Sequence, residues 1–119
     1  MSLTITSRVV SVVILELSGR LSVLEGTLAK GIKEFLEAGH RDFIVNLTNV
    51  TYIDSSGLGQ LVTIWTSIRG KGGQLVLVQP VERVREPLHI TKLDTIFHIV
   101  DDEAEALSRI QGTRAAQQI

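Results

Sequence analysis

The sequence has 119 residues, of which 44% are apolar and 21% are charged, and these values are typical of one soluble globular domain. Its formal net charge of −1 is too balanced to attract nucleic acid over the whole surface. The sequence has no cysteine, which excludes disulfides and thiolate metal sites, and His40, His89 and His98 lack metal-ligand spacing, so we expect neither a metal nor a cofactor.

The cellular compartment is predicted from two features that the sequence does not show, a membrane-spanning stretch and a secretory signal. The longest apolar stretch, Val9–Leu17, is broken by Ser11 and Glu16, and it is far shorter than the ~20 residues that span a bilayer. One arginine precedes this stretch and no small-residue cleavage site follows it, so no secretory signal is evident. We therefore expect a cytoplasmic protein with no direct membrane insertion.

Two antiparallel strands are expected at the start of the chain. Apolar and polar residues alternate over residues 3–6, and β-branched residues gather over residues 9–14, which is typical of strands. The turn between them is placed near Val10-Ser11, without the Asn-Gly or Asp-Gly pair of a tight hairpin. Gly19 is expected to end the second strand.

Apolar residues at helical spacing predict the first helix. They fall on one face of a helix that Gly39 closes, and they are Leu24, Leu28, Ile32, Phe35 and Leu36. A strand pattern resumes over residues 42–48.

A second helix and a buried strand come next. Helical spacing returns after residues 54–57 and runs out at residues 70–73, the apolar positions being Leu58, Leu61, Val62, Trp65 and Ile68. The segment at residues 74–79 is apolar at the consecutive positions 75–78, which is typical of a strand covered by helices on both faces of a sheet. We expect that strand to be central.

The last third of the chain predicts a helix, a strand and a helix. Pro87 lacks an N–H group and is harmless only in the first turn of a helix, so the first of these helices is expected to begin near Val84. Residues 95–99 predict a short strand. The acidic residues 101–103 predict the start of the final helix, because they complement its positive dipole end.

The order of the elements defines the fold class. Strands and helices alternate after the first two strands, and such alternation implies right-handed crossovers and a mostly parallel sheet. The chain is therefore α/β. Residues 1–111 are expected to form a single domain, and residues 112–119 have too few apolar residues to pack and are expected to be a mobile C-terminal tail.

One hexapeptide stands apart from the rest of the sequence. Residues 54–59, Asp-Ser-Ser-Gly-Leu-Gly, lie where a strand ends and a helix begins, at the edge where open α/β sheets place their sites. The free N–H groups and the positive dipole end of a helix start favour a phosphate there. Serine and aspartate are also ordinary helix N-caps, so capping and ligand binding both remain open.

The same hexapeptide disfavours three known kinds of site. Its spacing is neither that of a P-loop nor that of a dinucleotide fingerprint. It also differs from the Gly-x-Ser-x-Gly elbow of α/β hydrolases, and no histidine is placed by the sequence to activate a serine. A hydrolytic serine is therefore the least supported interpretation.

The hexapeptide in its context resembles the STAS domain, the fold of bacterial anti-sigma factor antagonists. It is preceded by the strand at residues 43–47 and followed by the Gly-Gly-Gln-Leu-Val-Leu of residues 72–77. The similarity covers about residues 3–110 and includes residues 93–97, which lead into an acidic helix. The resemblance implies a mixed, mostly parallel sheet flanked by about four helices.

The resemblance also implies a phosphorylation switch. In such antagonists the first serine after the aspartate, here Ser55, is phosphorylated by an anti-sigma factor that is also a serine kinase, and Ser56 is the less favoured acceptor. Phosphorylation stops binding to the anti-sigma factor, and a PP2C-type phosphatase restores it. The chain is then a ligand and substrate with no catalytic residues. The implied partner-binding residues are Arg20, Ser22, Asp54, Ser56, Gly57, Leu58 and Gly59.

Some of these positions carry a second interpretation. Leu58 also fits the apolar face of the helix, as a core residue. Arg20-Leu21-Ser22 stands where many antagonists carry an acidic, an apolar and an acidic residue, which questions the identity of the partner, although an arginine near Ser55 would suit a phosphate. This departure motivates an alternative function: an unphosphorylated STAS scaffold or accessory subunit of a stressosome or a lipid transport system.

Two further departures from the family pattern lie near the end of the chain. Lys92 stands where the family often has a helix-ending glycine, and Pro87 interrupts the preceding helix. Both are expected to alter a surface rather than the fold.

Overall fold

A five-stranded sheet runs through the part of the chain that the computed structural model describes, which is residues 3–9, 12–22 and 27–117. The strands lie in chain order from edge to edge. β1 is antiparallel to β2 and each later pair is parallel, so the predicted mixed, mostly parallel sheet is confirmed. They are β1 (Leu3–Val9), β2 (Val13–Leu21), β3 (Asp42–Ile53), β4 (Gln74–Val78) and β5 (His98–Val100).

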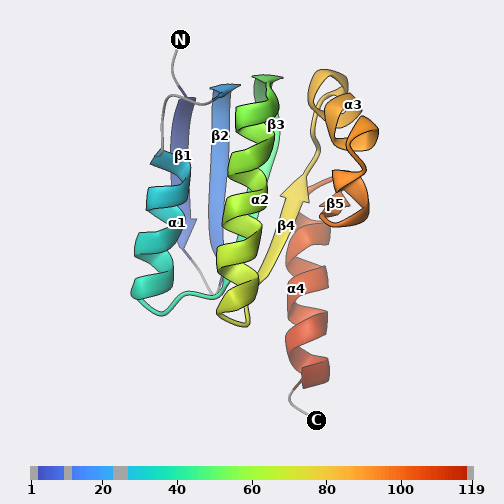
Figure 1. The fold of residues 1–119 in the computed structure, drawn as a ribbon. Helices are drawn as coiled ribbons and strands as arrows, with labels where there is room; N and C mark the ends of the chain where they lie inside the picture. The colour runs from blue at the N-terminus through green and yellow to red at the C-terminus, as the bar shows by residue number, and fades with distance from the viewer. Residues whose placement is uncertain (1–2, 10–11, 23–26, 118–119) are drawn as a thin grey trace.

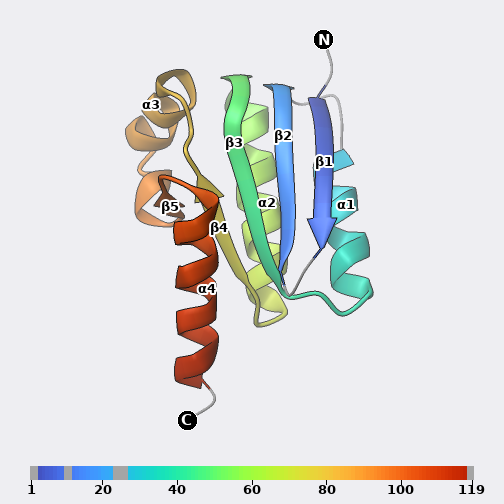
Figure 2. The same cartoon turned by 180° about the vertical axis from the view of Figure 1, so that it is seen from behind.

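Four α-helices in the described residues cover the two faces of the sheet unequally. Their bounds are α1 (Thr27–Glu37), α2 (Ser55–Gly70), α3 (Glu82–Ile90) and α4 (Glu103–Gln117). The first three contribute to the core on one face, as right-handed crossovers require, and α4 packs on the other (Figures 1 and 2). None of the described helices is long and apolar enough to cross a membrane.

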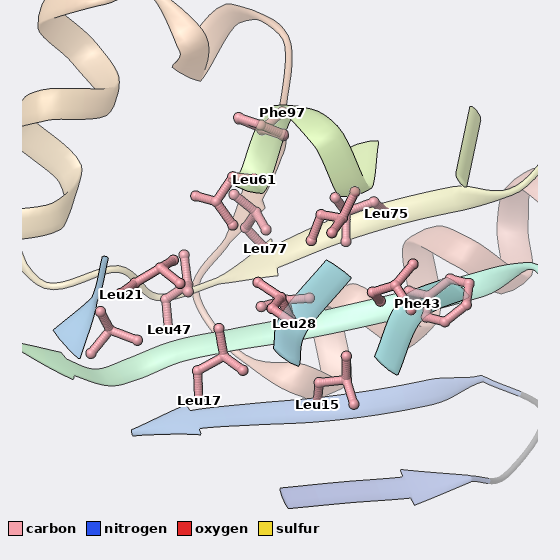
Figure 3. Packing of buried hydrophobic residues seen from close by; sticks show 14 of the residues in the cluster. Leu15, Leu17, Leu21, Leu28, Phe43, Leu47, Leu61, Leu75, Leu77 and Phe97 are labelled. Carbon is pink, nitrogen blue, oxygen red and sulfur yellow. The ribbon is translucent and has the colours of Figure 1, made fainter. Parts of the chain in front are cut away.

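The main core lies between the sheet and helices α1 and α2. Figure 3 shows Leu15, Phe43 and Leu77 from three strands packed together with Leu28 and Leu61 from the two helices. All five side chains are buried, with at most 3% of their surface exposed. The apolar spacing that predicts α1 and α2 is thus the spacing that fills this layer.

Strand β4 is buried on both faces, as its consecutive apolar residues predict. Leu75 and Leu77 face the main core, whereas Val76 and Val78 face α4. The expectation that β4 is the central strand is wrong, because the order of the sheet makes β3 central and places β4 between β3 and β5. The double burial comes from α4, which packs against the face of the sheet opposite α1 and α2.

Strands β2 and β3 extend further at their carboxyl ends than the sequence predicts. Gly19 does not end the second strand, because β2 continues to Leu21. Gly19 has φ +106° and lies beside a shift in the β2–β3 register, so it forms an irregularity within the strand. β3 runs past residue 48 to Ile53 because it pairs with this extension of β2. The predicted turn near Val10-Ser11 and the residue Leu24 lie outside the described residues.

The region after β4 also differs from the prediction. α3 begins at Glu82 rather than near Val84, so Pro87 lies inside the helix. Of the strand expected over residues 95–99, only the last two residues belong to β5. A 3₁₀ turn over Leu93–Thr95 precedes it.

The final helix extends beyond its predicted end. Residues 112–117 continue α4 and form no separate tail, and residues 118–119 lie outside the described residues. Arg114 explains the extension, because its guanidinium donates to both carboxylate oxygens of Asp42 over 2.6 and 3.0 Å. An ion pair with the start of β3, rather than apolar packing, thus holds the last turns of α4.

Lys92 has a left-handed backbone, with φ +61°, directly after α3. Replacing Lys92 by glycine removes the steric conflict of a Cβ in this conformation, so the free energy of unfolding is expected to rise by about 1 kcal/mol in urea titrations. The matched control is Thr91→Gly, because Thr91 has φ −83° and gains nothing from glycine. A Lys92→Gly protein that is less stable than the parent contradicts the expectation.

Candidate functional site

The carboxyl ends of β2 and β3 meet the start of α2 at one edge of the sheet. Arg20 pairs with Tyr52 and Leu21 with Ile53, so the residues that follow the two strands lie side by side. Segments that are about thirty residues apart in the sequence therefore form one surface, at the top of α2 in Figure 1. We call residues 20–22 and 52–60 the Ser55 rim.

Gly57 lets the first turn of α2 pack directly against β2. A Cβ at this position would overlap the carbonyl oxygen of Leu21 and lie 2.8 Å from Cγ1 of Ile53. No other residue type fits without moving the helix away from the strand. The small size of Gly57 therefore serves contact within the chain, and Gly57 is itself buried.

Asp54 caps α2 and ties it to the end of β2. Its Oδ1 accepts from the amide of Gly57 at 2.9 Å, and its Oδ2 accepts from the hydroxyl of Ser22 at 2.5 Å. The hydroxyl of Ser22, followed by the amide of Gly57, holds the pKa of Asp54 below its ordinary value of 3.8. Asp54 is thus ionised at neutral pH and fixed in place by two donors.

The two serines of the motif differ in access. Ser55 is the first residue of α2 and is exposed, whereas Ser56 is partly buried. Among the described residues, the hydroxyl of Ser55 has no hydrogen-bond partner. Of the two hydroxyls, that of Ser55 is therefore the more open to an external protein.

The remaining motif residues divide between core and surface. Leu58 is 9% exposed and packs in the main core, which is its second interpretation in the sequence. Gly59 is exposed, and a Cβ there would have no atom within 4 Å. Gly59 thus leaves open surface beside Ser55, whereas Leu58 offers little.

Residues 20–22, which depart from the family pattern, contact residues 52–60 within the rim in ways that the sequence does not predict. The guanidinium of Arg20 lies 4.0 Å from the centre of the Tyr52 ring, and Tyr52 is 37% exposed. Gln60 donates from Nε2 to the carbonyl oxygen of Ser22 at 2.5 Å. Sequence reasoning missed Tyr52 and Gln60 because only the β2–β3 register and one turn of α2 bring them here.

The histidines have partners away from Ser55. His40 packs against Phe35, His89 lies 2.8 Å from a carboxylate oxygen of Asp94, and His98 contacts Arg109. No group of three or more metal-ligating side chains occurs among the described residues. The rim therefore presents an exposed hydroxyl beside a carboxylate, and none of the three histidines is recorded in contact with Ser55 among the described residues.

Comparison with known proteins assigns the chain to a family. Residues 3–106 match the STAS domain, so the chain belongs to the STAS domain family and the resemblance seen in the sequence is confirmed. It is 44% identical over 79 residues to a candidate anti-sigma factor antagonist of Thermotoga neapolitana, an alignment that covers 66% of this chain and 70% of the relative.

Solved structures share the fold. A candidate anti-sigma factor antagonist from Thermotoga maritima superposes with a TM-score of 0.82 at 35% identity, covering 90% of this chain and 94% of that chain. The Bacillus cell fate determinant SpoIIAA in its phosphorylated form superposes with a TM-score of 0.68 at 20% identity, covering 92% of this chain and 99% of that chain. The second likeness concerns the fold alone.

Gly57 and Gly59 form a matched pair for testing the close approach of α2 to β2. Gly57→Ala forces α2 away from Leu21 and is expected to lower the free energy of unfolding by about 2 kcal/mol or more. Gly59→Ala meets open space and replaces a poor helix former, so a gain of about 0.5 kcal/mol is expected. Urea titrations of both variants measure the difference, and equal stabilities contradict the packing.

Ser22→Ala tests the carboxylate of Asp54. The variant loses the hydrogen bond that contributes most to the low pKa of Asp54, so this pKa is expected to rise toward 3.8 and to stay below it because the Gly57 amide remains. NMR titration of the carboxyl carbon measures the pKa. Ser18→Ala, at an exposed serine of β2, is the control and should leave it unchanged.

The lowered pKa of Asp54 determines in which direction pH changes the stability of the fold. The folded-state pKa of Asp54 is below the unfolded one, so the ionised carboxylate stabilises the fold above about pH 4 and this contribution is lost as the pH falls through the folded-state pKa. The stability difference between the parent and Ser22→Ala should shrink over that acidic range. A difference that is constant with pH refutes the assignment.

Proposed function

We propose that this chain is a cytoplasmic anti-sigma factor antagonist that binds an anti-sigma factor through the Ser55 rim and is switched off by phosphorylation of Ser55. The observation that carries the proposal is the exposed hydroxyl of Ser55 at the first position of α2, beside the fixed carboxylate of Asp54. The names of the relatives from Thermotoga support the antagonist role. The chain then acts as ligand and substrate, not as catalyst.

The rim has the properties of a docking surface. Tyr52 contributes an exposed aromatic ring, Arg20 lies over that ring, and Gly59 leaves room for a partner's backbone to approach. Asp54 and Ser56 complete the surface next to Ser55. Leu58 contributes little to this surface, because its side chain packs in the core.

A phosphate on Ser55 changes the charge of this surface. It adds about −1.5 to −2 charge at neutral pH, next to an Asp54 that is already ionised. One negative charge ~4 Å from a partner carboxylate costs about 4 kcal/mol at an effective dielectric near 20. This repulsion is sufficient to release a partner whose contact face is acidic, and Arg20 favours such a partner because it adds positive charge to the rim.

The proposal implies two enzymes that act on this chain. The anti-sigma factor is itself an ATP-dependent serine kinase that modifies Ser55, with Ser56 as the less favoured acceptor, and a PP2C-type phosphatase removes the phosphate. SpoIIAA shows that a protein of this fold exists in a phosphorylated form. The greater exposure of Ser55 supports its choice over Ser56.

Substitutions at Ser55 test the switch. Ser55→Ala is expected to bind the anti-sigma factor as the parent does but to resist phosphorylation, and Ser55→Asp is expected to bind at least about tenfold more weakly because of its negative charge. Ser67→Asp is the matched control, since Ser67 is exposed on the same helix three turns away. Isothermal titration calorimetry measures the affinities.

Phosphorylation itself is located by mass spectrometry after incubation with the cognate kinase and ATP. Phosphate on Ser55 supports the switch, and phosphate on neither Ser55 nor Ser56 counts against it, as do equal affinities of Ser55→Ala and Ser55→Asp. Recovery of the chain with a stressosome or a lipid transport complex, and without a kinase, favours the unphosphorylated scaffold instead.

A further inference from the structure

A cavity of about 300 Å³ lies at the end of α2 that is remote from the Ser55 rim. It opens where β4 begins, between α2 and α4 in the lower half of Figure 1. The residues that matter for its chemistry come from four elements and are Trp65, Arg69, Gln74, Leu75, His98 and Arg109. The Ser55 rim contributes no residue to it.

The cavity exists because the last strand is short. β5 pairs with β4 only over residues 76–78, and no other described strand pairs with Gln74 and Leu75 on that side. α2 and α4 pack on opposite faces of the sheet and continue past this step, so they form its two walls. The missing strand thus leaves a recess with a backbone edge at its base.

Two positive charges line the recess and are held in place. The guanidinium of Arg69 lies 5.8 Å from the centre of the Trp65 ring, and Nη2 of Arg109 lies 2.7 Å from Nδ1 of His98. Arginine has no acceptor, so Arg109 donates and His98 accepts as a neutral imidazole. Burial, followed by the charges of Arg109 and Arg69, lowers the pKa of His98, which agrees with this state.

No carboxylate neutralises these two charges in the part of the chain that the structure describes. Neither Arg69 nor Arg109 has an acidic side chain within 4.0 Å there. The nearby Asp42 is taken by Arg114, whose guanidinium bonds to both of its carboxylate oxygens. The recess therefore keeps a net positive charge that suits an anion.

An aromatic surface lies next to these charges. Trp65 is partly buried, and its ring meets Phe97 edge to face with 6.5 Å between the ring centres. This contact fixes the indole, and Trp65 is one of the residues that line the recess. A ligand that reaches both arginines therefore also meets a rigid, flat, apolar surface.

We propose that this recess binds a small aromatic phosphate, a molecule with one planar ring that carries a phosphate monoester. The phosphate lies between Arg69 and Arg109, because a guanidinium pairs with phosphate through two parallel hydrogen bonds. The ring lies against Trp65. The cavity volume is at the lower end of the range of roughly 300–1,000 Å³ for ligand sites, which suits a single ring and one phosphate group.

The protein reports on this site through its own fluorescence, because Trp65 is its single tryptophan. Phenyl phosphate is the probe, with inorganic phosphate and phenol as its two halves. Phenyl phosphate is expected to change the emission of Trp65 in a saturable way and to bind about tenfold or more tightly than either half. No saturable change at millimolar phenyl phosphate, or equal binding of the halves, overturns the proposal.

Charge-neutral variants identify the groups that hold the phosphate. Arg69→Gln and Arg109→Gln are each expected to weaken binding of phenyl phosphate about tenfold, whereas Arg85→Gln, at an exposed arginine of α3, should leave it unchanged. Equal losses in all three variants indicate unspecific attraction of anions and refute the site. If a variant fails to fold, the parent protein is titrated with phenyl phosphate and followed by NMR. The proposal then requires the indole N–H resonance of Trp65 to shift, and an unchanged resonance refutes it.

Binding of phenyl phosphate in the recess is independent of the proposed phosphorylation switch at Ser55. Ser55→Asp leaves every group of the recess in place, so it is expected to bind phenyl phosphate like the parent. Failure of the phosphorylation switch with intact binding, and the reverse, are therefore separate outcomes.

Discussion

The site depends on the absence of a side chain at residue 57. Because Gly57 lets α2 start in contact with the carbonyl of Leu21, the first turn of the helix lies level with the ends of β2 and β3. This position allows the Ser22 hydroxyl to reach Asp54 at 2.5 Å, and it leaves Ser55 on the outside. A helix displaced by the width of a methyl group loses that hydrogen bond and with it the anchor of the cap.

A phosphate at the start of α2 meets two opposing fields. The helix N-terminus carries about half a positive charge and attracts it, while the ionised Asp54 repels it. Asp54 cannot turn away without giving up its bonds to Ser22 and Gly57. Phosphorylation of Ser55 is therefore expected to change the charge of the rim without rearranging its residues. The main consequence is a change in the affinity for the protein that docks on the rim.

The sequence predicts those features that depend on local periodicity. Helical spacing and consecutive apolar residues predict α2 and the buried β4, because each pattern repeats within one element. The irregularity at Gly19 and the length of α4 escape prediction, since glycine signals a strand end equally well and the Arg114–Asp42 pair joins residues 72 positions apart. In the candidate site, the hexapeptide can be recognised from the sequence. The contact of Tyr52 with Arg20 cannot, because it depends on the register of β2 and β3.

At each end of helix α2, a glycine without a side chain lets the backbone pack closely against a neighbouring carbonyl group. Just beyond its carboxyl end, a Cβ on Gly73 would overlap the carbonyl of Arg41, as one on Gly57 would overlap that of Leu21. Ser55 and Arg69 are roughly 20 Å apart along this helix, and salt screens charges beyond about 8 Å at physiological ionic strength. A phosphate at one end therefore acts weakly on an anion at the other through charge alone, and a helix held at both ends has little freedom to transmit a movement. The rim and the recess are thus expected to be occupied independently.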